Sequence, residues 1–228
     1  MSTPSSDRSV GLGPTTWRSW TAPHGTRLRL RLLTPKDRDR LHEGFLRLSP
    51  ESRYRRFFTA KDELGDAELR YLTEIDGEDH FCLVLGEIDE EGQEVAGVGI
   101  ARFVRIAAEP EVAEPALAVL DAMQGHGLGR LLMLRLVAAA TERGVRQFRS
   151  EFLATNNAVR KLFSNVSDEV SFSSDGALAT AYMQLPQVEP DHPADEPAPQ
   201  SAVTRWLALA AASLVQLRHE LKARLGTE

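Results

Sequence analysis

The chain has little cysteine, no long apolar run and no signal-peptide pattern. Cys82 is the single cysteine among 228 residues, which excludes a disulfide within the chain and fits a reducing compartment. No apolar run reaches the roughly 20 residues that a membrane-spanning helix needs, and the N-terminus lacks a charged segment followed by an apolar one. These absences predict a cytoplasmic protein, for which a membrane is not an expected partner.

The chain also lacks a surplus of basic residues. Lysines and arginines number 27 against 33 aspartates and glutamates, which gives a net charge of −6. Because nucleic-acid-binding proteins normally carry a basic surplus, nucleic acid is not an expected partner. The hydrophobic content of 42% suffices for one good core and predicts a single medium-sized domain with tails.

Composition divides the chain into four parts. Residues 1–25 are rich in Ser, Thr, Pro and Gly, and we expect a flexible segment there, followed by the folded domain over 26–186. A linker rich in Pro and acidic residues follows at 187–201, and 202–228 are expected to form an amphipathic C-terminal helix. The apolar face of this helix, over 202–225, has three interpretations in order of preference: packing on its own domain, self-association, and lying on a membrane surface.

Within the domain, apolar spacing and turn residues predict alternating helices and strands. Leu28, Leu30 and Leu32 alternate with arginines, which is typical of a half-exposed first strand. The other expected strands cover 80–88, 94–106, 112–120, 145–153, 168–174 and 178–185, and the expected helices cover 35–48, 50–58, 66–75, a central segment from Leu131 and a short segment after Asn156. Cys82 falls in an apolar strand and is interpreted as a small core residue in preference to a reactive thiol.

The most informative segment is rich in glycine and precedes an apolar helix. Residues 124–130 read Gln-Gly-His-Gly-Leu-Gly-Arg, so that three of five consecutive residues lack a Cβ atom. A glycine-rich turn that opens a helix presents unpaired N–H groups and the positive end of the helix dipole. Together these features predict an anion site, and a phosphate or pyrophosphate is the expected ligand.

The spacing of the glycines excludes two common phosphate motifs. Glycine at every second position does not match Gly-x-Gly-x-x-Gly, and no Gly-Lys-Ser/Thr follows. Gln124, Gly127 and Gly129 instead fit Gln/Arg-x-x-Gly-x-Gly/Ala. This pattern resembles the acyl-coenzyme A pyrophosphate loop of the GNAT N-acetyltransferase superfamily. The order of strand, glycine loop, helix, strand and Asn-capped helix is similar to the coenzyme A-binding half of a GNAT domain.

The resemblance covers the whole predicted domain, 26–186. The helix starts at 34–37 and 49–58 resemble the first helix pair of a subgroup related to bacterial protein lysine acetyltransferases. The resemblance implies an α/β (α+β) GNAT fold, in which helices flank a mixed, mostly antiparallel central sheet. It also implies acetyl-CoA as cosubstrate, no metal, and direct acetyl transfer to a primary amine, with a protein lysine as favoured acceptor and a small-molecule amine as the alternative.

The same resemblance implies a set of cofactor contacts. Asn156 begins a match to the Asn-x-x-Met-x-x-Leu element of the family, and its side chain can contact the pantetheine arm, cap a helix, or do both. The implied cofactor-binding residues are Val119, Gln124, Gly125, His126, Gly127, Leu128, Gly129, Arg130 and Asn156.

Glu114 is the candidate general base. It lies ten residues before the loop on the strand that leads into it, where related lysine acetyltransferases have a proposed base. Apolar neighbours would make it a stronger base, because a desolvated carboxylate holds a proton more readily. The alternative is a glutamate at the strand edge that faces water. Pro115, which follows, fits the bulge and splaying known for this strand of the family. It fits a locally altered site equally well, because the family usually carries another residue there.

The sequence departs from the family after Phe163. The usual Gly-Phe pair and nearby tyrosine are absent from 164–168, so that the general acid is unassigned. This departure motivates an alternative function, a non-catalytic acyl-CoA-binding module with a regulatory or scaffolding role.

Two polar clusters have both functional and structural interpretations. Arg53, Arg55 and Arg56 can guide a nucleotide or an acidic acceptor, although exposed helix charge is the default. The polar segment 76–80 can recognise an acceptor or hold a metal, although a solvated loop is favoured.

Overall fold

A computed structural model describes residues 18–21 and 25–187 of the chain. The predicted C-terminal helix, and all but the first residue of the predicted linker, therefore lie outside the described residues. Within this part of the chain, no helix is both long enough and apolar enough to cross a membrane.

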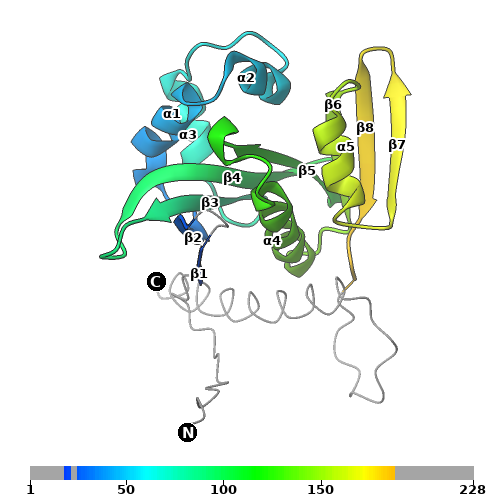
Figure 1. Cartoon of the computed structure of the whole chain (residues 1–228). Coiled ribbons are helices and arrows are strands. Elements are labelled where there is room, and N and C mark those ends of the chain that lie inside the picture. The colour runs from blue at the N-terminus through cyan, green and yellow to red at the C-terminus, as the bar shows by residue number, and fades with distance from the viewer. Residues whose placement is uncertain (1–17, 22–24, 188–228) are drawn as a thin grey trace, which may run out of the picture.

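One twisted sheet organises the molecule (Figure 1). Its strands lie in the order β1-β2-β3-β4-β5-β6-β8-β7. Neighbouring strands are antiparallel except β5 and β6, which are parallel, so the predicted mixed and mostly antiparallel sheet is confirmed. The strands are β1 (Arg18–Thr21), β2 (Arg27–Leu32), β3 (His80–Ile88), β4 (Glu94–Ile106), β5 (Glu109–Val119), β6 (Gln147–Leu153), β7 (Val170–Asp175) and β8 (Leu178–Gln184).

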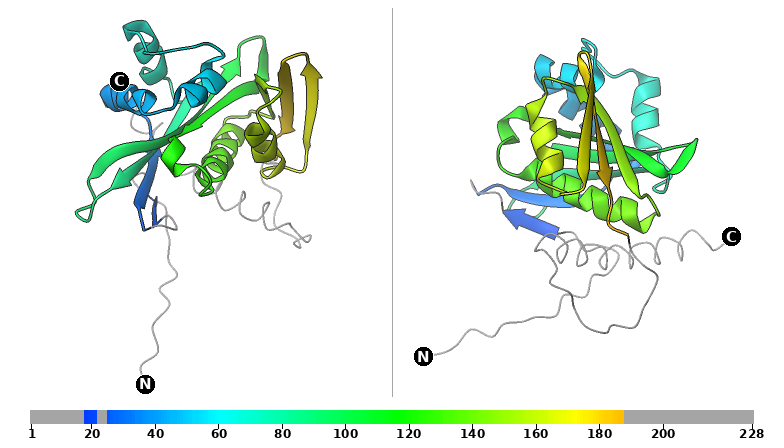
Figure 2. Two further views of the ribbon diagram at one scale, coloured as in Figure 1. Left: turned by 45° about the horizontal axis from the view of Figure 1, so that its top comes forward. Right: turned by 90° about the vertical axis from the view of Figure 1, so that its right-hand side faces the viewer.

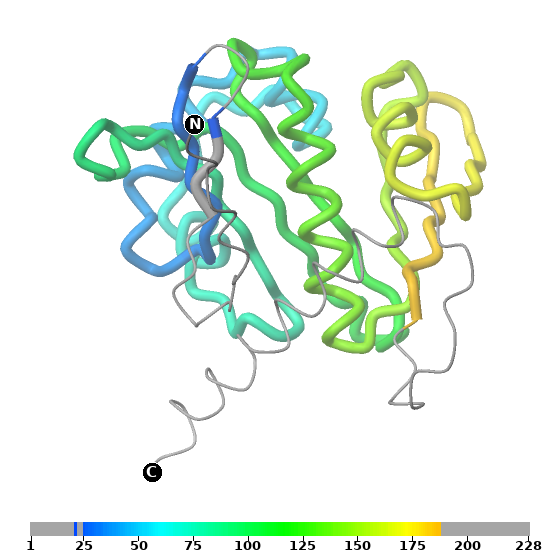
Figure 3. The backbone as a smooth tube through the Cα atoms, turned by 60° about the horizontal axis from the view of Figure 1, so that its bottom comes forward, coloured from blue at the N-terminus to red at the C-terminus, as the bar shows by residue number. Residues whose placement is uncertain are grey.

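Helices cover both faces of the sheet (Figures 1 and 2). The helices are α1 (Arg38–Leu46), α2 (Pro50–Phe57), α3 (Asp66–Thr73), α4 (Leu128–Glu142) and α5 (Asn157–Ser164), with short 3-10 turns η1 (Pro35–Asp37) and η2 (Asp121–Met123). Helices α1–α3 lie over one face of β3–β5, and α4 packs on the other. Figure 3 shows α4 along the middle of the molecule, with β6, α5, β7 and β8 to one side of it.

The main core forms between α4 and the sheet. The apolar sequence of α4 leaves few polar positions, as expected of a helix that is buried on most sides. Leu132, Leu136 and Ala139 of this helix are fully buried in one cluster with Phe103 of β4 and Phe148 of β6. A smaller apolar cluster under α1–α3 contains Phe45, Leu64 and Leu69. The two clusters fix the helices on opposite faces of the sheet.

Strands β5 and β6 pair only briefly. Among the described residues, their parallel pairs are Val112 with Gln147 and Ala113 with Phe148. Beyond Ala113, β5 continues to Val119 beside β4 alone, while β6 continues to Leu153 beside β8. The backbone of β5 over 114–119 therefore has an unpaired edge, which is a template for hydrogen bonding to an extended ligand. Pro115 at the start of this edge has no N–H to donate.

Three details correct the sequence-based expectations. Residues 18–21 lie in the segment expected to be flexible, yet they pair with β2 as strand β1. Helix α4 begins at Leu128 rather than at Leu131. Gly127 is its N-cap residue and has a left-handed backbone conformation, so the helix starts at the next residue. The register irregularity of the β4–β5 pair lies between Arg105 and Ile106, not beside Pro115.

Candidate functional site

The glycine-rich turn connects β5 to α4. Gly125 and Gly127 have φ values of 81° and 78°, a backbone conformation that residues with a Cβ atom rarely adopt. Within residues 25–187, the backbone N–H groups of Leu128, Gly129 and Arg130 donate to no protein acceptor. The first turn of α4 contains no acidic residue. Three amides and the positive end of a fifteen-residue helix are thus available to an anion.

The turn is not filled by the protein's own side chains. Among the described residues, a Cβ atom built on Gly125 or Gly127 would meet no heavy atom within 4 Å, and one on Gly129 would meet only the Cδ2 atom of Leu117 at 3.7 Å. Gly129 is helical, so neither its backbone conformation nor its neighbours require glycine. Close approach of a ligand is a physical reason for glycine at this position.

Polar side chains fix the turn in place without entering it. The Gln124 amide donates to the Val119 carbonyl at 3.0 Å, which ties the turn to the end of β5. The Nδ1 atom of His126 lies 3.3 Å from the Met123 carbonyl. Arg130 is exposed and donates to the Asn165 carbonyl at 3.2 Å, which links the start of α4 to the end of α5.

Helix α2 also anchors the turn, through η2. The carboxylate of Asp121 accepts hydrogen bonds from the Ser49 amide and hydroxyl, both at 2.9 Å, and from the Ser52 hydroxyl at 2.7 Å. The first helices and the glycine turn are therefore held in a fixed relation, although 72 positions separate Ser49 from Asp121.

Asn156 caps α5. Its buried side chain accepts a hydrogen bond from the Val159 amide at 3.3 Å, so the predicted capping role is confirmed. The other role expected for Asn156, contact with a cofactor arm, stays a prediction.

Glu114 lies on β5 just beyond the last residue paired with β6. It pairs with Val104 of β4, and alternation along the strands places both on the sheet face under α1–α3. Its side chain is exposed, and its charge attracts the Arg56 guanidinium. Glu114 therefore does not have apolar surroundings, because helix α2, which contacts β5, contributes charge. Its exposure agrees with the alternative of a glutamate that faces water.

Two buried residues of β3 share this face with Arg102 of β4. Nη1 of Arg102 lies 2.9 Å from Nε2 of His80, and burial together with the Arg102 charge lowers the pKa of His80 to about 4. Burial raises the pKa of the Cys82 thiol to about 11, so this cysteine is an unreactive core residue as predicted. Both side chains are uncharged near neutral pH.

The three arginines of α2 have different environments. Arg53 donates to the carbonyls of Lys61 and Asp62, and Arg55 pairs with Glu51 at 2.5 Å on the exposed side of the helix. Arg56 faces the sheet and lines a cavity with Arg102. The default of exposed helix charge is therefore right for Arg55 and wrong for Arg56.

The polar segment 76–80 is mainly a structured turn. Oδ1 of Asp76 accepts hydrogen bonds from the amides of Glu78, Asp79 and His80, and Asp79 pairs with Arg105 at 2.7 Å. No group of three or more potential metal ligands is present among the described residues.

Sequence analysis missed Arg102. The signal was a single charged residue between apolar neighbours in the middle of the strand 94–106, a position that is normally buried. Nothing in the local sequence indicated that Arg56, from a helix, would join it.

Comparisons with known proteins agree on one family. The model of the acetyltransferase (GNAT) family matches residues 38–165. Acetyltransferase Pat of Mycolicibacterium smegmatis is 36% identical over 137 residues, which are 60% of this chain but 40% of that protein. The GNAT domain of S. lividans PAT superposes with a TM-score of 0.65 at 28% identity, over 74% of this chain and 97% of that one. The structure of yncA from Salmonella typhimurium with its cofactor acetyl-CoA has a TM-score of 0.55 at 18% identity, over 73% and 98% of the two chains, and shows likeness of fold alone.

Proposed function

Because this chain belongs to the acetyltransferase (GNAT) family, we propose that it transfers an acetyl group from acetyl-CoA to a primary amine, with a protein lysine as the favoured acceptor. The proposed catalytic domain is residues 26–186. The observation that carries the proposal is the first turn of α4, where the backbone N–H groups of 128–130 donate to no acceptor among the described residues, beside the unpaired edge of β5.

The turn supports a role in holding the cofactor diphosphate. Its amides and the dipole of α4 favour negative charge, and Arg130 adds a cation at the same turn. The unpaired edge of β5 supports a role in binding the pantetheine arm, whose amide groups can pair with strand backbone as an added strand does. Among the implied cofactor contacts, Val119 is the last residue of β5. Asn156 caps α5, the helix that follows β6, and β6 is the strand that separates from β5.

Glu114 is the proposed general base. The amine nitrogen attacks the thioester carbonyl, a carbon–nitrogen bond forms, and the carbon–sulfur bond breaks. The amine proton passes to the Glu114 carboxylate, directly or through a water molecule, which its exposure permits. The leaving thiolate takes a proton from solvent, since no side chain is assigned as general acid.

The protein lysine acceptor is supported by the resemblance of the first helix pair to protein lysine acetyltransferases. The name of the relative Pat is compatible with it, although the match spans 40% of that protein. A small-molecule amine is the alternative acceptor. The C-terminal helix, which lies outside the described residues, is proposed to pack on the domain or to mediate self-association.

Incubation with labelled acetyl-CoA, cell proteins and a panel of small amines tests the proposal. We expect label on protein lysines, and a drop in kcat of about 100-fold or more for Glu114→Gln, as for loss of a general base. Glu111→Gln is the matched control, because Glu111 is an exposed glutamate of the same strand that pairs with Arg146. Gly127→Glu should abolish coenzyme A binding. Transfer that Glu114→Gln leaves unchanged would exclude Glu114 as base.

The departure from the family at 164–168 favours a second candidate, a non-catalytic acyl-CoA-binding module. The same assay separates the two. Tight binding of acetyl-CoA with no transfer to any amine, in the wild type as in Glu114→Gln, would exclude the proposed acetyltransferase activity and support the non-catalytic binding module.

A further inference from the structure

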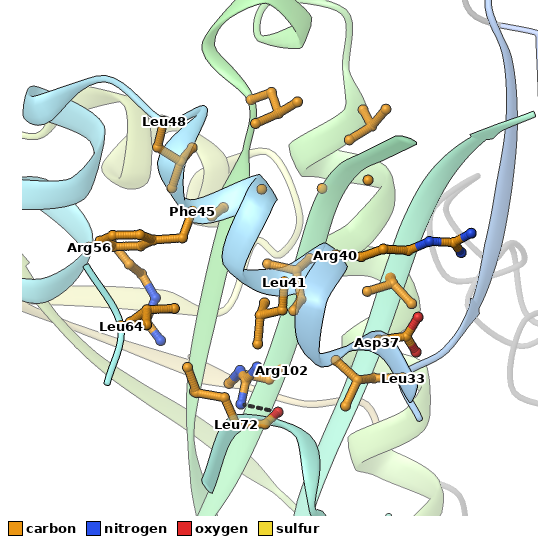
Figure 4. A pocket seen from close by; sticks show the side chains of 18 of the residues that line it. Leu33, Asp37, Arg40, Leu41, Phe45, Leu48, Arg56, Leu64, Leu72 and Arg102 are labelled. Atoms are coloured by element: carbon orange, nitrogen blue, oxygen red, sulfur yellow. Dashed lines mark hydrogen bonds between the residues drawn. The ribbon is translucent and has the colours of Figure 1, made fainter. Parts of the chain in front are cut away.

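A cavity lies between helices α1–α3 and the sheet face of β3–β5 (Figure 4). Its volume is about 100 Å³, several times the roughly 10–15 Å³ that one water molecule needs. Most of its lining is apolar, from Leu41, Phe45 and Leu72 among others. Charged side chains enter at two ends: Arg40 and Asp37 at one, Arg56 and Arg102 at the other.

The first end is electrically balanced. Arg31 donates to both carboxylate oxygens of Asp37, at 2.7 and 2.5 Å, and to those of Glu94, both at 2.7 Å. Arg40 adds a contact to Glu94 at 3.1 Å. Two cations thus meet two carboxylates, as is normal for charges that are removed from water.

In the described part of the chain, no anion is bonded to the positive charge at the second end. Arg102 is 5% exposed, and its contacts are neutral: the Leu72 carbonyl at 3.2 Å and the ring of His80. Within residues 25–187, Arg56 makes no hydrogen bond or ion pair, and its guanidinium lies 5.0 Å from the centre of the Phe57 ring. Burial and repulsion by Arg102 lower the pKa of Arg56.

Glu114 does not neutralise this end. It attracts Arg56, but no nitrogen–oxygen contact within 4.0 Å joins the two among the described residues. Arg102 pairs with Ala116, two positions along β5 from Glu114. Diagonal neighbours of this kind on one sheet face lie about 7–8 Å apart. Glu114 and the two arginines therefore belong to one surface, and a group held by the arginines would lie near an amine that Glu114 deprotonates.

We propose that Arg56 and Arg102 form a carboxylate-binding site that recognises an acidic group on the acceptor. Planar guanidinium groups bind carboxylates through paired, charge-assisted hydrogen bonds, and two of them beside apolar walls compete well with water for such a group. The proposal rests on the proposed function. In a protein acceptor the carboxylate is an Asp or Glu side chain next to the lysine, and in a free amino acid it is the molecule's own carboxylate.

The test uses the full chain and matched acceptors. The first kind of pair consists of two lysine peptides, one with glutamate and one with glutamine at the same position near the lysine. The position is varied over the three residues on each side of the lysine. The second pair is free lysine and lysine amide. We measure kcat/KM for each acceptor, and the binding of each peptide in the presence of coenzyme A, for the wild type, Arg56→Gln, Arg56→Lys and the control Arg55→Gln. Arg55 is adjacent on α2 but is exposed and paired with Glu51.

In the wild type, at least one acidic acceptor should exceed its neutral counterpart by about 10-fold or more, as for hydrogen bonds to a charged group. The pair that shows the preference identifies the source of the carboxylate. Arg56→Gln should remove the preference mainly through KM, Arg56→Lys should keep part of it, and Arg55→Gln should keep all of it. Arg56→Gln should also melt no lower than the wild type, since it removes a cation that Arg102 repels.

Equal use and equal binding of acidic and neutral acceptors by the wild type would overturn the carboxylate site, as would a preference that survives in Arg56→Gln. Failure of the proposed function gives a different result. No acceptor is then acetylated, while the binding measurement still shows whether acidic peptides bind better than neutral ones and whether Arg56 is responsible.

Discussion

Replacement of Gly129 by glutamate distinguishes what the ligand requires at the α4 turn from what the fold requires. Gly129 is helical, and an added Cβ atom would lie 3.7 Å from Leu117, which is an ordinary contact. The fold should therefore tolerate glutamate, and the free energy of unfolding should rise by up to about 1 kcal/mol, because glutamate has the higher helix propensity and its charge is favourable in the first turn of a helix. The melting temperature should increase or stay unchanged.

Coenzyme A binding should respond in the opposite direction. The Gly129 amide belongs to this turn, and a glutamate carboxylate at this position repels a diphosphate and keeps it from the amides. Loss of one hydrogen bond to a charged group costs about 1.5–3 kcal/mol, which corresponds to roughly a 10- to 150-fold weaker Kd. The assay is calorimetric titration of coenzyme A, paired with thermal denaturation of the same samples.

Ala67→Glu is the matched control. Ala67 is exposed and is likewise the second residue of a helix, α3. This variant should keep a stability close to that of the wild type and bind coenzyme A as the wild type does. If Gly129→Glu also bound coenzyme A with wild-type affinity, the turn at 128–130 would not hold the diphosphate, and the reasoning from its amides would be refuted.

Two further predictions concern the stability of the fold. Leu136 is fully buried against the sheet, so Leu136→Ala should lower the free energy of unfolding by about 2–5 kcal/mol in denaturant titration. The control Leu46→Ala, at a side chain that is 52% exposed, should change this free energy by less than about 0.5 kcal/mol. Equal effects of the two substitutions would contradict the position assigned to α4. The pKa of His80 is lowered from 6.5 to about 4 in the folded state, so the unfolded state binds more protons between these values, and stability should fall as the pH drops from 6.5 to 4, by up to about 3 kcal/mol. His80→Gln should lack this part of the pH dependence, and an unchanged profile would show that His80 titrates normally.

Much of the fold could be predicted because its signals are local. Alternating leucines located β2, and apolar runs bounded by turn residues located β3 and β4. The glycine pattern at 124–130 located the start of α4 to within three residues and indicated the family, which the family match confirms. The capping role of Asn156 was also predictable, since a cap depends on residues that are three positions apart.

Part of the candidate site could not be predicted, because distant segments create it. Arg55 and Arg56 are neighbours in the sequence, yet one pairs with Glu51 at the surface and the other lines a cavity. The direction of each side chain depends on how α2 lies on the sheet, and Asp121 sets that position through hydrogen bonds across 72 residues. Glu114 was located on the correct strand, but its exposure depends on which elements cover that face.

The sequence by itself determined the helix turn with free amides, because left-handed glycines and a following apolar run are properties of adjacent residues. Only the tertiary structure decided that β5 separates from β6 after Ala113 and that Arg56 meets Arg102 beneath the helices. The physical reason is that strand pairing and the burial of charge depend on which segments pack together. Hydrogen bonds, desolvation and repulsion between residues that are far apart in the chain cannot be predicted from the residues next to them in the sequence.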